Sequence, residues 1–203
     1  MKIGVLALQG DFALHVKALA GCGSASRGGV SGEASGEMTE IEAVEVRKPE
    51  QLAEIDGLII PGGESTTLLK LMDEWRFVPA LQRFHAEGRP IFGTCAGLIL
   101  LAHEVENPRQ FSLGFIDVGV ERNAYGRQRE SFEAEVEVAG VGTVPAMFIR
   151  APVFEDPGEA VEVLAMWDGR PIAVRSGGVL AIAFHPELAG TLAMHRFFLE
   201  EVV

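Results

Sequence analysis

The 203-residue sequence contains few residues that form covalent cross-links: its only cysteines are Cys22 and Cys95. Two cysteines cannot build the disulfide framework on which many small secreted domains depend. We therefore expect a chain of the reducing cytoplasm, in which a thiol stays free for chemistry.

Long apolar runs and basic residues are also scarce. The best apolar run, residues 91–102, is interrupted by Gly93 and Gly97 and falls short of the roughly 20 residues that span a bilayer. The 17 Lys and Arg are outnumbered by 29 Asp and Glu, which gives a net charge of −12. Because phosphate groups and anionic lipids attract basic surfaces, we expect neither a nucleic acid nor a membrane as a partner.

Apolar runs alternate with helical patterns through the first half of the sequence. Buried strands are predicted at 2–8, 41–46, 57–60 and 90–93, and helices at 12–20, after residue 67 to about 75, and at 78–87. Beyond residue 110 strands dominate: they are predicted at 113–120, 131–138, 143–149, 161–167 and, as a hairpin, 171–184, before a closing helix at 191–203. We expect an α/β fold with a mostly parallel central sheet flanked by helices and an antiparallel portion in the C-terminal half.

Residues 21–40 differ from this pattern. They are rich in Gly, Ser and Glu, nearly lack large apolar side chains and show no periodicity. We expect a flexible surface insertion there, within one domain that spans residues 1–203.

Cys95 follows the predicted strand 90–93 and precedes an apolar helix. Gly93-Thr94-Cys95-Ala96-Gly97 has the G-x-nucleophile-x-G spacing of a nucleophile elbow, in which small residues let strand and helix pack closely. A helix N-terminus would also stabilise a thiolate. The pattern indicates a nucleophile, although a small buried cysteine in a strand-to-helix turn would fit the same window.

A glycine-rich loop, Pro61-Gly62-Gly63-Glu64-Ser65-Thr66-Thr67, lies between the predicted strand 57–60 and a helix. Such a loop presents backbone N–H groups to a phosphate or to the oxyanion of a tetrahedral intermediate, although a tight turn alone would also need glycines. The spacing and the lysine of a nucleotide-binding loop are absent.

His185 follows another apolar strand, and Glu187 comes two residues later. Because parallel strands end at one edge of a sheet, we expect His185, Cys95 and the glycine-rich loop to meet there. The remaining histidines fall on predicted helices and are expected at the surface or in an interface: His15, His85, His103 and His195. No cluster has the spacing of metal ligands, so we expect no metal.

These segments resemble a known family. Residues 93–97 and 185–187 resemble the class I (triad) glutamine amidotransferases, which have a flavodoxin-like α/β fold. Further segments resemble the glutaminase subunits of pyridoxal 5'-phosphate synthases over nearly the whole chain: 8–10, 47–52, 61–67, 121–123, 126–128, 131–133 and 148–152. The insertion at 21–40 is longer than the turn usual in that family.

The resemblance implies a function. A glutaminase of this family hydrolyses L-glutamine to L-glutamate and ammonia through a cysteine thioester. The ammonia passes to a synthase subunit in a large heteromeric complex that makes pyridoxal 5'-phosphate (vitamin B6), and full activity depends on that partner. No lysine of this sequence has a recognisable Schiff-base setting, so we expect no bound cofactor.

The resemblance also implies residue roles. Cys95 would be the nucleophile, His185 the base and Glu187 the residue that orients it. Gly62, Gly63 and Ala96 would supply oxyanion donors. Glutamine would contact residues from three segments: Gly63, Glu64, Ser65, Arg122, Ile149 and Arg150.

Two other functions remain open from the sequence. Another cysteine hydrolase, such as a small peptidase or deglycase, would share the elbow cysteine and the histidine but would not need Arg122 or residues 148–150. A regulatory or assembly subunit with a degenerate site would have no reason to keep Cys95, His185 and Glu187 together. Turnover of glutamine distinguishes these functions.

Overall fold

A computed structural model of the chain describes residues 1–24, 40–122 and 131–203. Its main sheet has the strand order β10-β11-β12-β4-β3-β1-β2. Five neighbouring strands run parallel: β2 (Glu42–Val46), β1 (Lys2–Leu6), β3 (Gly57–Ile60), β4 (Ile91–Thr94) and β12 (Val179–Ile182). This succession matches the 2-1-3-4-5 order of flavodoxin-like folds, with β12 as the fifth parallel strand.

The antiparallel portion lies in the C-terminal half, as the sequence predicts. Strands β10 (Glu162–Trp167) and β11 (Arg170–Ser176) extend the main sheet beyond β12, and the predicted hairpin joins β11 to β12. A three-stranded sheet contains β5 (Ala102–Glu106), β6 (Ile116–Glu121) and β9 (Val153–Glu155). Strands β7 (Ser131–Val138) and β8 (Gly142–Ile149) form a separate antiparallel pair.

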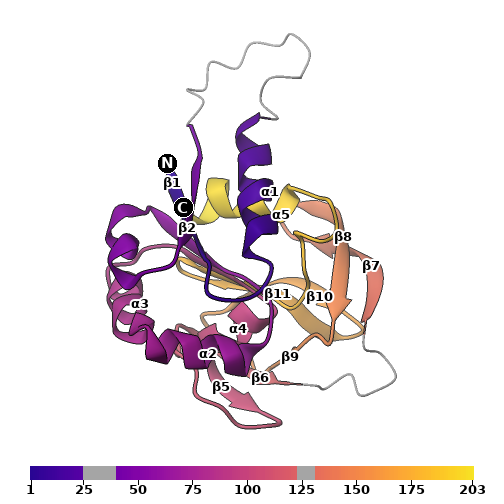
Figure 1. Cartoon of the computed structure of the whole chain (residues 1–203). Coiled ribbons are helices and arrows are strands. Elements are labelled where there is room, and N and C mark those ends of the chain that lie inside the picture. The colour runs from indigo at the N-terminus through magenta and orange to yellow at the C-terminus, as the bar shows by residue number, and fades with distance from the viewer. Residues whose placement is uncertain (25–39, 123–130) are drawn as a thin grey trace.

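Helices cover both faces of the main sheet (Figure 1). On one face lie α1 (Phe12–Ser24), α5 (Ala193–Phe197) and the π-helical turn η3 (Phe198–Val202). On the other lie α2 (Ser65–Glu74), α3 (Phe77–Ala86) and α4 (Ala96–Leu101), while the 3-10 turn η2 (Pro49–Glu54) connects β2 to β3. The two chain termini lie close together in Figure 1.

Three predictions about local structure are wrong or incomplete. Residues 21–24 belong to α1 and not to a flexible insertion, and residues 25–39 of that predicted insertion lie outside the described residues, as do residues 126–128. The helix after Cys95 ends at Leu101, and strand β5 follows without a turn because residues 102–106 pair with distant β6. Neither β5 nor the short β9 is predicted from the sequence.

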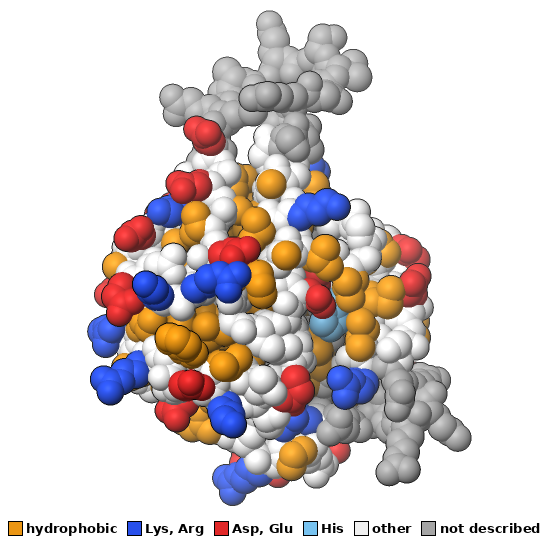
Figure 2. Space-filling view, viewed as in Figure 1, with side chains coloured by type: hydrophobic (Ala, Val, Ile, Leu, Met, Phe, Trp, Pro, Cys, Tyr) orange, Lys and Arg blue, Asp and Glu red, His pale blue; other side chains and the backbone are white. Residues whose placement is uncertain are grey.

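Buried side chains form one hydrophobic cluster that includes Ile3 of β1 and Leu199 near the C-terminus. Strand β3 is fully buried, which explains its uninterrupted apolar sequence. Acidic and basic side chains are interspersed over the face of Figure 2, with hydrophobic side chains between them. Among the described residues, no helix combines the length and apolar character that a membrane crossing requires.

Candidate active site

Cys95 occupies a strained turn between β4 and α4. Its backbone has φ 47° and ψ −100°, a conformation that costs a non-glycine residue energy and is typical of a nucleophile elbow. Its N–H donates to the Ile182 carbonyl, 2.9 Å away, and so fixes the turn to β12. A Cβ atom on Gly97 would lie 2.1 Å from the Ile60 carbonyl oxygen, so only glycine lets α4 pack this closely.

His185 and Glu187 follow β12 and form a hydrogen-bonded pair. His185 Nδ1 lies 2.7 Å from Glu187 Oε1, the backbone N–H of His185 donates to the Met147 carbonyl, and the Glu187 side chain is fully buried. Burial alone would lower the pKa of His185, but hydrogen bonds and charge interactions with Cys95 and Glu187 outweigh it and raise this pKa to about 10. At neutral pH His185 is therefore an imidazolium.

The glycine-rich loop packs against this pair. A Cβ atom on Gly62 would lie 2.3 Å from Cε1 of His185, and one on Gly63 would lie 2.5 Å from the Gln9 amide oxygen. The Glu64 N–H donates to that same Gln9 oxygen at 3.0 Å. Gln9 therefore fixes the loop against the first strand, and the absence of side chains at Gly62 and Gly63 allows the close approach.

Glu64 caps the N-terminus of α2. Its carboxylate accepts hydrogen bonds from the backbone N–H and the hydroxyl of both Thr66 and Thr67. Burial would raise the pKa of Glu64, but these four hydrogen bonds outweigh it and lower this pKa to about 2. Glu64 is therefore a carboxylate throughout the physiological range and can meet a cationic group, such as the α-ammonium of an amino acid.

Most of the predicted site residues line one cavity of about 290 Å³. This is close to the lower limit of roughly 300 Å³ for ligand pockets and suits a small metabolite. The cavity is lined by the predicted residues Gly63, Glu64, Ser65, Cys95, Arg122, Ile149, Arg150 and His185, together with Gln9, Asp11, Ile99 and Pro152. Glu187 lies behind His185, whereas Gly62 and Ala96 are adjacent to the lining residues without being among them.

One polar residue beside the cavity, Gln110, is not predicted from the sequence. Its side-chain oxygen accepts hydrogen bonds from the Ser65 hydroxyl at 3.2 Å and from Arg122 Nη1 at 2.8 Å. It therefore joins two predicted substrate-binding residues that come from different elements. No sequence signal marks Gln110, because it lies in a connecting segment with no motif. Gln9 and Asp11, in contrast, follow β1 at the same sheet edge as Cys95, and that position could have indicated them.

The expectation that the other histidines lie at the surface is wrong for two of the four. His15 and His195 are fully buried and lie 2.9 Å apart, Nδ1 to Nε2. His85 is half-buried and stacks on Phe115. His103 is exposed and pairs with Asp117, but it lies on β5 and not on a helix.

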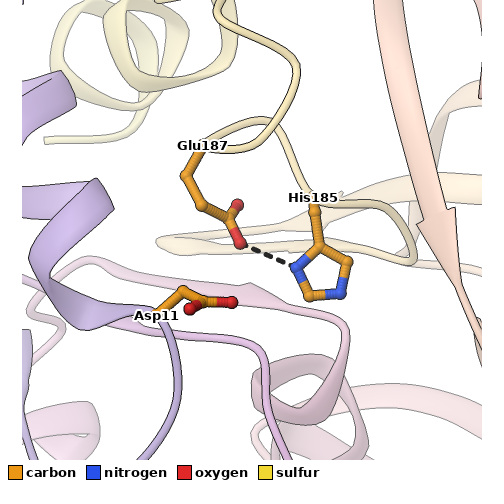
Figure 3. Close-up of side chains that lie close together, drawn as sticks. All are labelled: Asp11, His185 and Glu187. Atoms are coloured by element: carbon orange, nitrogen blue, oxygen red, sulfur yellow. Dashed lines mark hydrogen bonds and ion pairs between the residues drawn. The ribbon is translucent and has the colours of Figure 1, made fainter.

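Asp11 is the remaining ionisable group near the pair. Figure 3 shows the carboxylate of Asp11, the residue before α1, directed toward Glu187 and His185. Ligand atoms of these three residues lie within 4.8 Å of one another and could in principle hold a metal ion. However, His185 Nδ1 and Glu187 Oε1 are hydrogen-bonded to each other, so the donor set is already partly used. The expectation of a site without metal stays a prediction.

The fold and the site together define a class of protein. A thiol on a strand-to-helix elbow, with an imidazolium beside it and a carboxylate behind that, is the arrangement of enzymes that transfer acyl groups through a cysteine. The chain belongs to the SNO glutamine amidotransferase family, whose pattern matches residues 5–203.

Relatives match the chain along its whole length. The pyridoxal 5'-phosphate synthase subunit PdxT of a Geobacillus species is 50% identical and covers 100% of this chain and 97% of its own. The protein of the same name from Pelotomaculum thermopropionicum is 49% identical, with coverages of 100% and 96%. The protein of that name from Thermotoga petrophila is 48% identical and covers 100% of this chain and 100% of its own.

Solved structures agree with the fold. A crystal structure of a glutamine amidotransferase has a TM-score of 0.85 at 48% identity and covers 98% of this chain and 97% of its own. A putative GMP synthase protein from Thermoplasma acidophilum has a TM-score of 0.63 at 16% identity, with coverages of 98% and 92%. At that identity the second likeness concerns the fold alone.

Proposed function

We propose that this chain is the glutaminase subunit of a pyridoxal 5'-phosphate synthase. It hydrolyses L-glutamine to L-glutamate and ammonia for the synthesis of pyridoxal 5'-phosphate. The observation that carries the proposal is one cavity in which Cys95, His185 and Arg122 meet, in a chain 48–50% identical to PdxT proteins over its whole length.

The first half of the reaction acylates Cys95. The thiolate attacks the carboxamide carbon of glutamine, and the carbonyl oxygen becomes an oxyanion. Backbone N–H groups of the Gly62-Gly63 turn and of Ala96 stabilise that oxyanion. His185, protonated at neutral pH, donates its proton to the departing nitrogen as the C–N bond breaks. Ammonia leaves, and a γ-glutamyl thioester remains on the cysteine.

The second half of the reaction returns the enzyme to its starting state. His185, now neutral, takes a proton from a water molecule that attacks the thioester carbon. The C–S bond breaks, glutamate leaves, and the Cys95 thiolate is again paired with the His185 imidazolium. Glu187 holds Nδ1 of His185 throughout, 2.7 Å away, so that the other ring nitrogen faces the reacting atoms.

Other residues that line the cavity recognise the amino-acid end of glutamine. Arg122 offers a guanidinium that matches the α-carboxylate, while the Glu64 carboxylate attracts the α-ammonium. Ser65, Ile149 and Arg150 complete the binding surface. We assign these roles because all five residues line the cavity that contains Cys95.

Three further features belong to this proposal. The chain works as one domain, which is supported by a hydrophobic cluster of the described residues that includes both Ile3 and Leu199. It acts in the cytoplasm, where a catalytic thiol stays reduced; both Cys22 and Cys95 are unpaired. It assembles with a synthase subunit that receives the ammonia.

Release of glutamate from glutamine tests the proposal. The purified chain is assayed alone and mixed with a pyridoxal 5'-phosphate synthase subunit, with Cys95→Ala as the control. We expect a rate that rises sharply with the partner and disappears in Cys95→Ala. A folded protein that makes no glutamate in either mixture would refute the proposal and favour the peptidase-like or non-enzymatic functions.

A further inference from the structure

Two buried histidines adjoin the candidate triad and have no place in the mechanism above. His15 lies on α1 and His195 on α5, and neither side chain has any exposed surface. The two residues are separated by 180 positions in the sequence and meet only because α1 and α5 pack on the same face of the sheet (Figure 1). Buried polar side chains are rarely retained without a hydrogen-bonding partner, so their contacts indicate what they do.

These contacts extend from the triad into the interior. Glu187 Oε1 is hydrogen-bonded to His185, and the other oxygen of Glu187, Oε2, lies 3.4 Å from Nε2 of His15. His15 Nδ1 in turn lies 2.9 Å from Nε2 of His195. Among the described residues, Glu187 Oε2 makes no hydrogen bond of normal geometry, so its contact with His15 is a 3.4 Å approach of the two polar atoms. The Thr94 hydroxyl oxygen lies 3.4 Å from the same His15 nitrogen. Glu187 therefore lies between two histidines, one at the cavity and one in the core.

The protonation of the inner pair follows from its surroundings. Burial, together with the neighbouring His195 and His185, holds the pKa of His15 well below its ordinary value. Burial lowers the pKa of His195 to about 4. Both rings are therefore neutral at physiological pH, and each carries a single N–H.

Only one placement of these two protons satisfies the carboxylate. If His15 carried its proton on Nδ1, the bare Nε2 would face Glu187, and a buried carboxylate oxygen would have no donor. If His195 donates from Nε2 instead, His15 accepts at Nδ1 and donates from Nε2 toward Glu187. The atom left without a partner is then Nδ1 of His195, an acceptor with no proton.

We propose that His15 is a positioning residue of the glutaminase reaction, whose Nε2–H, fixed by His195, holds the second oxygen of Glu187 and thereby orients His185. This inference rests on the proposed glutaminase function. It extends the Cys95–His185–Glu187 set inward by two residues that are never in contact with the substrate.

Loss of the His15 donor changes how Glu187 binds protons. A buried carboxylate oxygen without a donor takes up a proton more readily, and a protonated Glu187 cannot hold the His185 imidazolium. The acid limb of the pH profile of kcat/KM should therefore move to higher pH. The ionisable groups that face this pair are His185, His195 and Asp11, with Cys95 beyond His185, and a substitution at His15 leaves all of these in place.

Two substitutions separate hydrogen bonding from packing. His15→Phe keeps an aromatic ring but has no N–H, whereas His15→Gln keeps an N–H donor near the position of Nε2. In the full complex with the synthase subunit, we expect His15→Phe to lower kcat about 10- to 100-fold, the effect of losing a hydrogen bond to a charged group. KM should stay within about twofold and the acid limb should move up. His15→Gln should recover most of kcat and the original limb.

His85→Phe is the matched control, because His85 stacks on Phe115 away from the triad; its kcat and pH profile should be unchanged. A folded His15→Phe with normal kcat and pH profile would overturn the proposal. The proposal would also be overturned if His15→Phe lowered kcat without moving the acid limb and His15→Gln failed to restore kcat. Such a result would mean that His15 contributes only packing. If His15→Phe does not fold, His195→Phe serves instead, with a smaller loss of kcat and the same upward shift.

A spectroscopic readout keeps this test independent of glutamine turnover. The proton on His185 Nδ1, hydrogen-bonded to Glu187, gives a downfield NMR signal that His185→Gln identifies by its loss. We expect His15→Phe to shift or broaden this signal and His15→Gln to preserve it. An unchanged signal in His15→Phe refutes the positioning role, whether or not the chain hydrolyses glutamine. Absence of glutamate from the unmutated complex refutes only the proposed function.

Discussion

Two groups of residues around the cavity, which we call the chemical wall (Cys95 and His185) and the recognition wall (Glu64 and Arg122), are held in place by different means. On the chemical wall Cys95 and His185 are buried, and each is fixed by a backbone hydrogen bond: the Cys95 N–H donates to Ile182 of β12 and the His185 N–H to Met147 of β8. On the recognition wall the Glu64 side chain is 42% exposed and Arg122 is held by polar partners, Gln110 and Glu64. Packing fixes atoms more precisely than exposed polar contacts do. Changes to the first wall should therefore alter kcat, and changes to the second should alter KM.

The largest effect is expected from the chemical wall. His185→Gln removes the proposed proton donor for the departing ammonia and should lower kcat about 10²- to 10⁴-fold with little change in KM. Glutamate release by the complex measures the loss, and a melting temperature close to that of the unmutated chain shows that the fold is intact. A kcat within tenfold of the original would mean that the chemistry does not run through His185.

The next effect comes from the recognition wall. Arg122→Met removes a guanidinium whose Nη1 donates to Gln110 at 2.8 Å and whose Nη2 lies 3.5 Å from Glu64. Because the proposed hydrogen bond from Arg122 to the substrate is lost in ground state and transition state alike, KM should rise about 10- to 100-fold while kcat stays within a few fold. Initial rates over a wide range of glutamine concentration measure both constants. A lower kcat at unchanged KM would contradict the division between the walls.

The dependence of kcat/KM on pH also distinguishes the chemical wall from the recognition wall. The folded chain holds the His185 proton up to about pH 10, so kcat/KM should be steady through neutrality and fall about tenfold per pH unit above 10. Arg122→Met should keep this alkaline limb, because it leaves His185 and Glu187 untouched. The proton on His185 also stabilises the folded chain. This stabilisation is fully present at pH values below the ordinary histidine pKa of about 6.5 and is lost as the pH rises toward 10. An alkaline limb near 6.5 would contradict the ion pair.

The smallest effect is expected at Gln110, which supports the recognition wall from behind. Gln110→Ala removes the oxygen shared by Ser65 and Arg122, and the guanidinium should then be less well oriented. KM should rise about two- to tenfold, in keeping with the loss of one or two hydrogen bonds, with kcat unchanged. Gln82→Ala, at an exposed position on α3, is the control. Equal KM values for the two variants would show that Gln110 does not orient Arg122.

The sequence predicted the chemical wall more fully than the recognition wall. The elbow around Cys95 and the pair His185 and Glu187 are short local motifs, so their residue types and spacing are visible without a structure. Gln110 lies in a connecting segment, and its role depends on meeting Ser65 and Arg122 from two other elements. All the predicted roles, those of Cys95, His185 and Glu187 as well as those of Gly62, Gly63 and Ala96, remain proposals that the variants above and the glutaminase assay examine.

Local patterns also predicted the sheet better than the helix ends. Strand β3 has the predicted bounds, because a short buried run between turn signals allows few alternatives. The boundary between α4 and β5 could not be predicted, since residues 96–106 contain no turn signal and the chain leaves the helix only to pair with β6. A helical pattern in the sequence is thus overridden where a strand pairing gives the backbone better hydrogen bonds.

The sequence by itself determined the α/β class and predicted a candidate nucleophile, Cys95, with His185 and Glu187 as its partners, because periodicity and motif spacing act over a few neighbouring residues. Only the tertiary structure decided that His15 and His195 leave the surface, meet across 180 positions and stand behind Glu187. A lone histidine on a helix has the same local pattern whether it faces water or another helix. Which of these it faces is settled by how α1 and α5 pack on the sheet, and that packing depends on apolar contacts spread over the whole chain.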